Sequence, residues 1–233
     1  MKEALKKALL QIYADMEKAR QKQENEGRHD QGQRGDVTSG QHLNSVLSVI
    51  RDDLIHVGFK EEEIITDGSE LTLPGWFRPA KNWDMLVFSE KTLLAFIELK
   101  SINSSFGNNY NNRAEETIGS AIDVLHAIKN ELIPVTYQPP MGGYVMIVKL
   151  CEDSCRTVKN PDSRYPIDKE FTDSSYFKRF SLLCRRMLAE RLYQSIWLVG
   201  VDPEKRVVIE PEQDLTYEKF ITSIESMLRI KKA

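Results

Sequence analysis

A chain of 233 residues can bury one substantial core, and its 41% hydrophobic and 29% charged residues are ordinary for a soluble globular protein. No apolar run approaches the roughly 20 residues that a membrane-spanning helix needs, and acidic residues interrupt the N-terminal stretch where a signal peptide would be apolar. The net charge of −3 argues against a protein that coats nucleic acid without regard to sequence. We therefore expect one domain over 1–233 that is cytoplasmic and has no membrane attachment; three cysteines without a disulfide-rich pattern fit a reducing compartment.

The N-terminal part of the chain is predicted to form two helices joined by a mobile loop. Apolar residues recur at helical spacing through residues 1–20, which indicates an amphipathic helix. Residues 21–37 are rich in glutamine and glycine and have no apolar period, which predicts the loop. Thr38 and Gln41 have the spacing of a capping box, so we expect a second helix to begin there and to run to about Val57.

Strands follow these helices. Two apolar runs separated by Glu90 and Lys91 predict a β-hairpin over residues 83–100. Residues 112–131 are predicted to be the next helix. Its expected buried stripe is Ile118, Ile122, Leu125, Ile128 and Leu132.

The remainder of the chain alternates strands and helices. We expect strands over 143–150 and 195–201, a short strand within 206–211, and helices over 176–192 and 217–230. The helix after the hairpin is long enough to cross between parallel strands. The order therefore predicts an α/β fold with a mixed central β-sheet flanked by helices.

Charged residues stand out in the apolar hairpin. Asp84 begins its first strand, and Glu98 and Lys100 end its second, so antiparallel pairing brings all three to one end. Side chains two apart in a strand share a face, which places Glu98 beside Lys100 and turns Leu99 the other way. Such charges are unfavourable at a buried position unless they are solvated, paired or bound to something. A simple ion pair between Glu98 and Lys100 is one explanation.

A metal-dependent nuclease site is the other explanation. Asp-x13-Glu-x-Lys resembles the arrangement of the PD-(D/E)XK nuclease superfamily. Asp84 and Glu98 would supply the hard carboxylate oxygens that suit Mg²⁺, and Leu99 would add its backbone carbonyl. The metal polarises the scissile phosphate and lowers the pKa of a bound water. Lys100 would orient or help to deprotonate that water and offset charge in the transition state.

Asparagines crowd the segment after this strand. Asn112 and Glu115 fit a helix N-cap and its partner, which predicts that the residues before Asn112 form a loop. Asparagine can pair with adenine and arginine with guanine, and a helix N-terminus offers donors to phosphate. The predicted DNA contacts are Asn108, Asn109, Asn111, Asn112, Arg113 and Glu116. The basic helix over 176–192 is better explained by a solvated polar face than by a nucleic-acid surface.

A family resemblance rests on these same residues. "WDMLVFSEKTLLAFIELKS" followed by "SFGNNYNNRAEETIGSAID" is similar to the XhoI family of type II restriction endonucleases, and "LPGWFRPAKNWD" resembles that family's approach to its catalytic aspartate. The likeness is strong over residues 70–126. Trp83 stands where the superfamily's name has proline; proline is often absent there, so little is put in doubt.

The resemblance implies Mg²⁺-dependent hydrolysis of double-stranded DNA at a palindrome, expected to be 5′-CTCGAG cut after the first C, leaving 5′-phosphate ends. Asp84, Glu98 and Lys100 would be catalytic within a core over 70–202, flanked by N-terminal helices over 1–57 and a C-terminal strand and helix over 203–233. A homodimer and a cognate DNA methyltransferase of the same restriction-modification system would be its partners. The alternatives are a structure-selective or repair nuclease on the same core and a DNA-binding module whose catalytic site has decayed.

Overall fold

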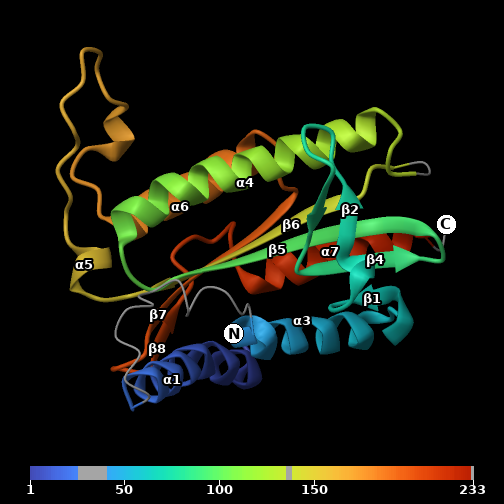
Figure 1. Ribbon diagram of the computed structural model, residues 1–233, viewed down its shortest axis with the longest axis horizontal. Helices are drawn as coiled ribbons and strands as arrows, with labels where there is room; N and C mark the ends of the chain where they lie inside the picture. The colour runs from blue at the N-terminus through green and yellow to red at the C-terminus, as the bar shows by residue number, and fades with distance from the viewer. Residues whose placement is uncertain (26–40, 135–137, 232–233) are drawn as a thin grey trace.

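The computed structural model describes residues 1–25, 41–134 and 138–231, and these residues form three layers with a sheet in the middle (Figure 1). The six-stranded sheet has the order β1-β4-β5-β6-β7-β8. Its strands are β1 (Ile64–Ile65), β4 (Met85–Ser89), β5 (Thr92–Ile102), β6 (Met141–Lys149), β7 (Ser195–Asp202) and β8 (Val207–Ile209). The predicted mixed sheet flanked by helices is confirmed.

Parallel and antiparallel pairs divide the sheet. β5, β6 and β7 are parallel neighbours, whereas β1, β4 and β8 pair antiparallel with theirs. The helices α4 (Phe106–Lys129) and α6 (Tyr176–Ala189) lie in the two crossovers between the parallel strands, as connections of this kind require. The central strands are buried on both faces, which explains their nearly continuous apolar sequences.

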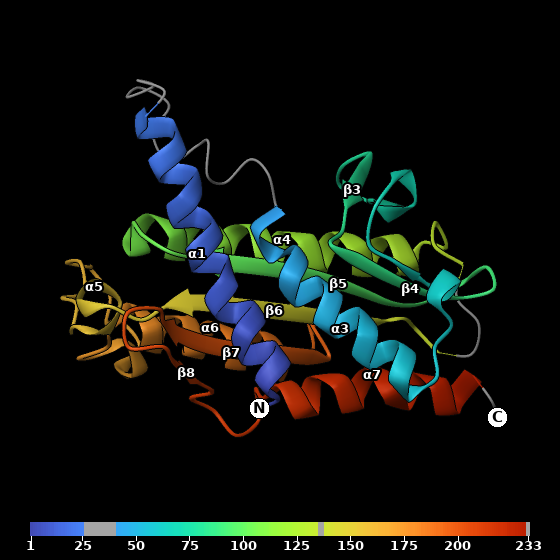
Figure 2. The ribbon, with the colours of Figure 1, turned by 90° about the horizontal axis from the view of Figure 1, so that it is seen from below.

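One face of the sheet is covered by α1 (Glu3–Asn25), α3 (Asn44–Val57) and α7 (Tyr217–Lys231), which share one hydrophobic core with the strands (Figure 2). Leu5, Leu9 and Ile12 of α1 are fully buried there, as the helical period predicts. The other face is covered by α4 and α6, and a second core lies beneath them. No helix in the described ranges is long and apolar enough to cross a membrane.

The boundaries of the N-terminal helices differ from the prediction. Residues 21–25 continue α1 and are not part of a loop, while 26–37 lie outside the described residues. Gln41 lies in a short 3-10 turn (Gln41–Leu43), so α3 begins only at Asn44, and the proposed cap Thr38 is also outside the described residues. Gly58 ends α3 in a left-handed conformation with φ of 114°, which favours glycine.

The helix α4 begins at Phe106 and not at Asn112, so the predicted asparagine-rich loop is helical. The reason is aromatic packing between α4 and α6. Phe106 is buried with its ring 6.4 Å from that of Tyr176, and Tyr110, one turn later, meets Phe180 edge-on at 5.5 Å. This packing outweighs the weak helix propensity of asparagine.

The predicted buried stripe of α4 is only partly confirmed. Ile118 and Ile128 pack against the second core, whereas Ile122 and Leu132 are exposed. The residues of α4 that are buried beyond its first turn are Thr117, Ser120, Ala121, Asp123, Val124 and Ala127. Their side chains are mostly small, so the helix can lie close to a sheet whose own aromatic side chains fill the space; Tyr144 of β6, for example, meets the hydroxyl of Thr117 at 3.0 Å.

A second, smaller sheet was not predicted. β2 (Thr72–Pro74) and β3 (Ala80–Asn82) pair antiparallel and enclose the loop over 75–79. Short helical turns occupy other connections: Glu61–Glu63, Ser69–Leu71, α5 (Glu152–Cys155) and Lys169–Phe171. The hairpin of β2 and β3 leads directly to Asp84.

Candidate active site

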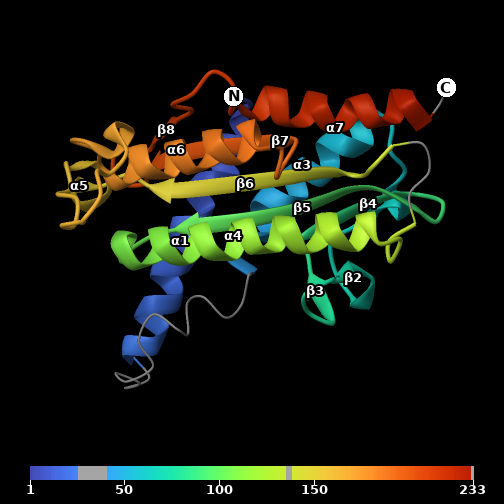
Figure 3. The ribbon, with the colours of Figure 1, turned by 90° about the horizontal axis from the view of Figure 1, so that it is seen from above.

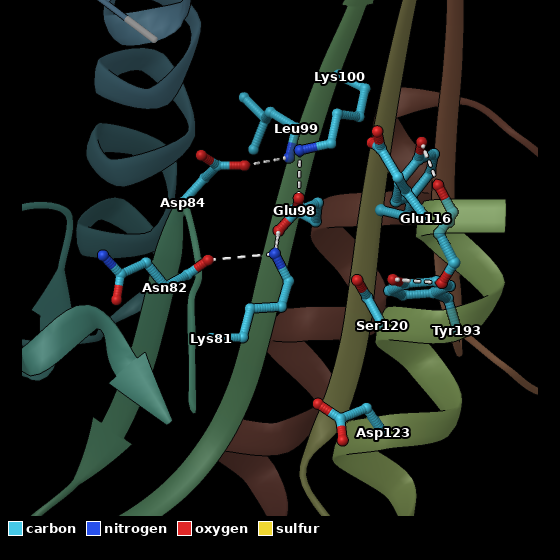
Figure 4. Close-up of polar contacts among 12 residues, drawn as sticks. Lys81, Asn82, Asp84, Glu98, Leu99, Lys100, Glu116, Ser120, Asp123 and Tyr193 are labelled. Carbon is cyan, nitrogen blue, oxygen red and sulfur yellow. Dashed lines mark hydrogen bonds and ion pairs between the residues drawn. The ribbon is translucent and has the colours of Figure 1, made fainter. Parts of the chain in front are cut away.

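The register of β4 and β5 brings the three predicted catalytic residues together (Figure 4). Asp84 lies just before β4, where its N–H donates to the carbonyl of Ile97 at 3.1 Å. The N–H of Leu99 in turn donates to Oδ2 of Asp84 at 2.7 Å. Asp84 is therefore one residue outside the strand in which it was expected, and β5 continues past Lys100 to Ile102, but the predicted convergence holds.

Side-chain alternation in β5 is as predicted. Glu98 is 5% exposed and forms an ion pair with Nζ of Lys100 through Oε1. Leu99 points to the opposite face and is buried in the core under α1 and α3. The ion pair that was considered as an alternative is thus present. Its position beside Asp84 makes it part of the site.

Lys81 is a cation of this site that sequence reasoning missed. Its Nζ lies 2.7 Å from Oε2 of Glu98, donates to the carbonyl of Asn82 at 3.1 Å, and sits 4.6 Å from the ring centre of Trp83. Oε2 accepts no hydrogen bond of good geometry within the described residues, so the ammonium of Lys81 offsets its charge by proximity. A basic residue shortly before the candidate aspartate was the available signal.

Burial raises the pKa of Asp84, and the nearby carboxylate of Glu98 raises that pKa further. The N–H of Leu99 and the ammonium groups of Lys100 and Lys81 oppose this shift. Two carboxylates held close in a partly buried site are suited to a shared divalent cation. Mg²⁺ uses one or two carboxylates and completes its shell with waters and phosphate oxygens, so these donors fit it. Within the described residues no group of three or more His, Cys, Asp or Glu is placed to hold a metal ion.

A cavity of about 360 Å³ lies over Glu98 and Lys100. The residues that line it also include Arg78, Lys81, Glu115, Glu116, Thr117, Gly119, Ser120 and Tyr193. Glu116 forms an ion pair with Arg113 at 2.6 Å, so these two predicted DNA contacts meet at the cavity that Glu98 and Lys100 line. The site thus combines carboxylates and ammonium groups with this cavity between β5 and α4.

Sequence comparison identifies the family. Residues 22–208 match the family described as restriction endonuclease XhoI. The chain belongs to the XhoI family of restriction endonucleases. It is 37% identical over 204 residues to the type II restriction enzyme BstVI of Geobacillus stearothermophilus, which covers 84% of this chain and 90% of that enzyme. It is also 37% identical over 188 residues to the type II restriction enzyme XhoI of Xanthomonas vasicola, which covers 80% of this chain and 72% of that enzyme. No solved structure matches the chain.

In this XhoI-family chain, Trp83 occupies the position at which the name of the PD-(D/E)XK superfamily has proline. The side chain is buried and its ring lies 4.7 Å from that of Phe96 on β5. The contact packs the residue just before Asp84 against β5. The same ring carries the ammonium of Lys81 on its face.

The predicted DNA contacts of the XhoI-family segment divide into separate groups. Asn109 donates from Nδ2 to the carbonyl of Ser104 at 2.6 Å and so secures the start of α4. Asn108 and Asn111 line a second cavity, of about 570 Å³, together with Lys159 and Asn160 of the loop after α5. Asn112 is exposed. These asparagines were predicted to lie together in one loop. Because the segment is helical, with 3.6 residues per turn, their side chains point in different directions.

The basic helix α6 does not present a uniformly solvated face. Arg179 is buried and donates to Ser174, Asn160 and the carbonyl of Val158. Arg186 pairs with Asp168 at 2.5 Å. Both arginines contact the loop that follows α5. The expectation of a solvated polar face is wrong for the buried Arg179 and correct for Arg186, which is exposed.

Proposed function

We propose that this protein is a type II restriction endonuclease that uses Mg²⁺ to hydrolyse both strands of double-stranded DNA at a palindrome. The expected target is 5′-CTCGAG, cut after the first C to leave 5′-phosphate ends. The observation that carries the proposal is the meeting of Asp84, Glu98 and Lys100 beside one cavity, in a chain of a restriction endonuclease family.

The residues of the site have separate tasks in this reaction. Asp84, Glu98 and the carbonyl of Leu99 would hold Mg²⁺, which when bound supplies a Lewis acid for the phosphate and a more acidic water. Lys100 has ammonium protons beyond the one directed at Glu98, and these can orient the attacking water. Lys81 adds positive charge where negative charge develops on the phosphate. Arg113 and Glu116 are candidates for contacts with the DNA strand that enters the cavity.

The proposed target implies a homodimer. A palindrome presents the same half-site twice, so two-fold protein symmetry would place one active site on each strand. Mass measurement on the free protein and on its DNA complex tests this. A complex with one protomer that still cuts both strands contradicts it. A cognate methyltransferase, which would protect host DNA, and a cytoplasmic location belong to the same proposal.

Digestion of a sequenced plasmid, followed by mapping of the fragment ends, is the deciding experiment. Discrete fragments with ends within 5′-CTCGAG, formed only with a divalent cation, are expected. Discrete ends at another palindrome would retain the enzyme class and replace the target. Cleavage without discrete fragments would favour a repair nuclease, and binding without metal-dependent nicking would favour a decayed DNA-binding module.

A further inference from the structure

An exposed aromatic pair projects beside the active-site cavity. Trp76 is 47% and Phe77 67% exposed, and both lie in the loop over 75–79 between β2 and β3. Figures 2 and 3 show that this hairpin extends from the body of the molecule next to α4. Trp83 and Trp197, the other tryptophans, are buried. Large apolar side chains held out in solvent are unfavourable for a free protein and indicate a contact surface.

The loop that carries the pair is fixed from beneath. Oδ1 of Asp123 on α4 accepts hydrogen bonds from the N–H groups of Trp76 and Phe77 at 2.8 and 2.7 Å, and Oδ2 accepts one from Nε of Arg78 at 2.8 Å. A Cβ at Gly75 would lie 2.5 Å from the carbonyl oxygen of Arg78 and 2.6 Å from Oδ2 of Asp123, so only glycine fits. The backbone that carries both rings is therefore fixed before any partner binds, which lowers the entropy lost on binding.

The aromatic pair is continuous with the cavity over Glu98 and Lys100. Arg78, next to Phe77, lines that cavity, and so does Gly119 of α4. Ile122, which is exposed, and His126 follow Gly119 on the same helix face, and the ring of Phe77 lies 5.2 Å from that of His126. The rise from Gly119 to His126 is about 10 Å. That length is about three nucleotides along one strand of a duplex.

The size of the patch distinguishes between two kinds of partner. An aromatic side chain buries about 150–250 Å², so Trp76 and Phe77 together supply a few hundred Å². A stable protein interface buries about 1,200–2,000 Å² in total, which this pair cannot provide as a core. Aromatic rings next to cationic groups are instead suited to DNA, because such side chains can insert between the base steps of a duplex and partly unstack them.

We propose that Trp76 and Phe77 contact the DNA duplex about three nucleotides from the phosphate that is cleaved, and that Asp123 positions them for this contact. The inference rests on the proposed function, because the cavity must hold the cleaved phosphate. It adds a binding surface outside the catalytic residues and outside the asparagine-rich part of α4.

Fluorescence of Trp76 provides a direct test in the unaltered protein. Acrylamide quenches exposed tryptophan, and Trp76 is the exposed one of the three. With Ca²⁺ in place of Mg²⁺ to prevent cleavage, saturation with a duplex that the protein cleaves should protect Trp76 from quenching. The Trp76→Phe variant should lack the quenchable signal, which assigns it. Protection that grows with protein concentration in the absence of DNA would overturn the proposal in favour of self-association.

Substitution provides a second measurement. Phe77→Ala should raise the dissociation constant for the duplex on the order of 10- to 100-fold, the scale of one lost base–aromatic contact. Ile209→Ala is a matched control, because Ile209 is exposed on β8 at the opposite edge of the sheet, and its affinity should not change. Suppose that Trp76 stays open to quenching in the Ca²⁺ complex, while the same duplex is cleaved normally with Mg²⁺. That result would overturn this inference and leave the proposed function standing. Failure to bind or cleave any duplex would overturn both.

Discussion

The charged residues around Glu98 and the asparagine-rich first turns of α4 lie at different cavities, and they hold their polar side chains in different ways. Glu98 is almost fully buried and forms ion pairs with both Lys100 and Lys81. Asn108, Asn111 and Asn112 on α4 are exposed. Buried, mutually paired charges are suited to chemistry, because their positions are fixed and the surrounding dielectric is low. Exposed amides are suited to recognition. Variants from the two regions should therefore separate cleavage from binding.

Removal of Lys100 should have the largest effect. Lys100→Ala leaves Asp84, Glu98 and the Leu99 carbonyl in place, so duplex binding with Ca²⁺ should persist. Single-turnover cleavage should fall on the order of 10²–10⁴-fold, the scale of a lost proton-transfer or electrostatic group. Glu98→Ala should differ by also losing the metal dependence of tight binding. Near-normal cleavage by Lys100→Ala would remove the basis for a nuclease site on this strand.

Lys81→Met tests whether the ammonium group that β3 supplies acts together with the hairpin of β4 and β5 in the proposed cleavage. The methionine keeps the apolar stem but leaves Oε2 of Glu98 without its nearest cation. We expect cleavage to fall by about 10-fold or more, with partial recovery in Lys81→Arg. Lys91→Met in the exposed turn of the same hairpin is the matched control and should cleave normally. Equal rates for the Lys81 and Lys91 variants would show that Lys81 is only structural.

Arg113→Ala tests the helix side of the comparison. If Arg113 reads guanine, cognate binding should weaken by roughly 1–3 kcal/mol and discrimination at that base should fall. If it contacts phosphate alone, affinity should fall about equally for all sequences. Lys205→Ala, in the exposed turn between β7 and β8, is the control and should bind normally. A loss of thermal stability without any change in binding would make the Arg113–Glu116 pair structural.

Acidification should loosen the loop over 75–79. Burial alone would raise the pKa of Asp123, but the N–H groups of Phe77 and Trp76 together with Arg78 hold it below its ordinary value. A lowered folded-state pKa means that this stabilisation is present above the unfolded pKa, about 3.9, and is lost as pH falls through the folded-state value. Asp123→Asn should therefore unfold more easily than the unaltered protein at pH 7, by about 1–2 kcal/mol in urea titrations. The difference should shrink below about pH 4; a difference independent of pH would contradict the charge-based anchor.

The sequence by itself determined the elements whose positions follow from local pattern. Apolar periodicity located α1, α3, the central strands and the α/β class, because burial of a regular stripe has the same signature wherever it occurs. The alternation of β5 likewise fixed Glu98 and Lys100 on one face and Leu99 on the other. The turn at Glu90 and Lys91 then placed Asp84 opposite Glu98. These assignments needed only strand geometry and a hairpin connection.

Tertiary structure alone decided the start of α4, its buried face and the partners of Asp123. Phe106 and Tyr110 make the asparagine-rich segment helical only because α6 supplies Tyr176 and Phe180, which come much later in the chain. Asp123 anchors the loop over 75–79 through contacts that no sequence spacing encodes. The place of Lys81 shortly before Asp84 was a signal, but only the fold brings its ammonium group to Glu98. Local pattern reports how one element is buried, whereas the contacts between elements depend on the packing of the whole chain.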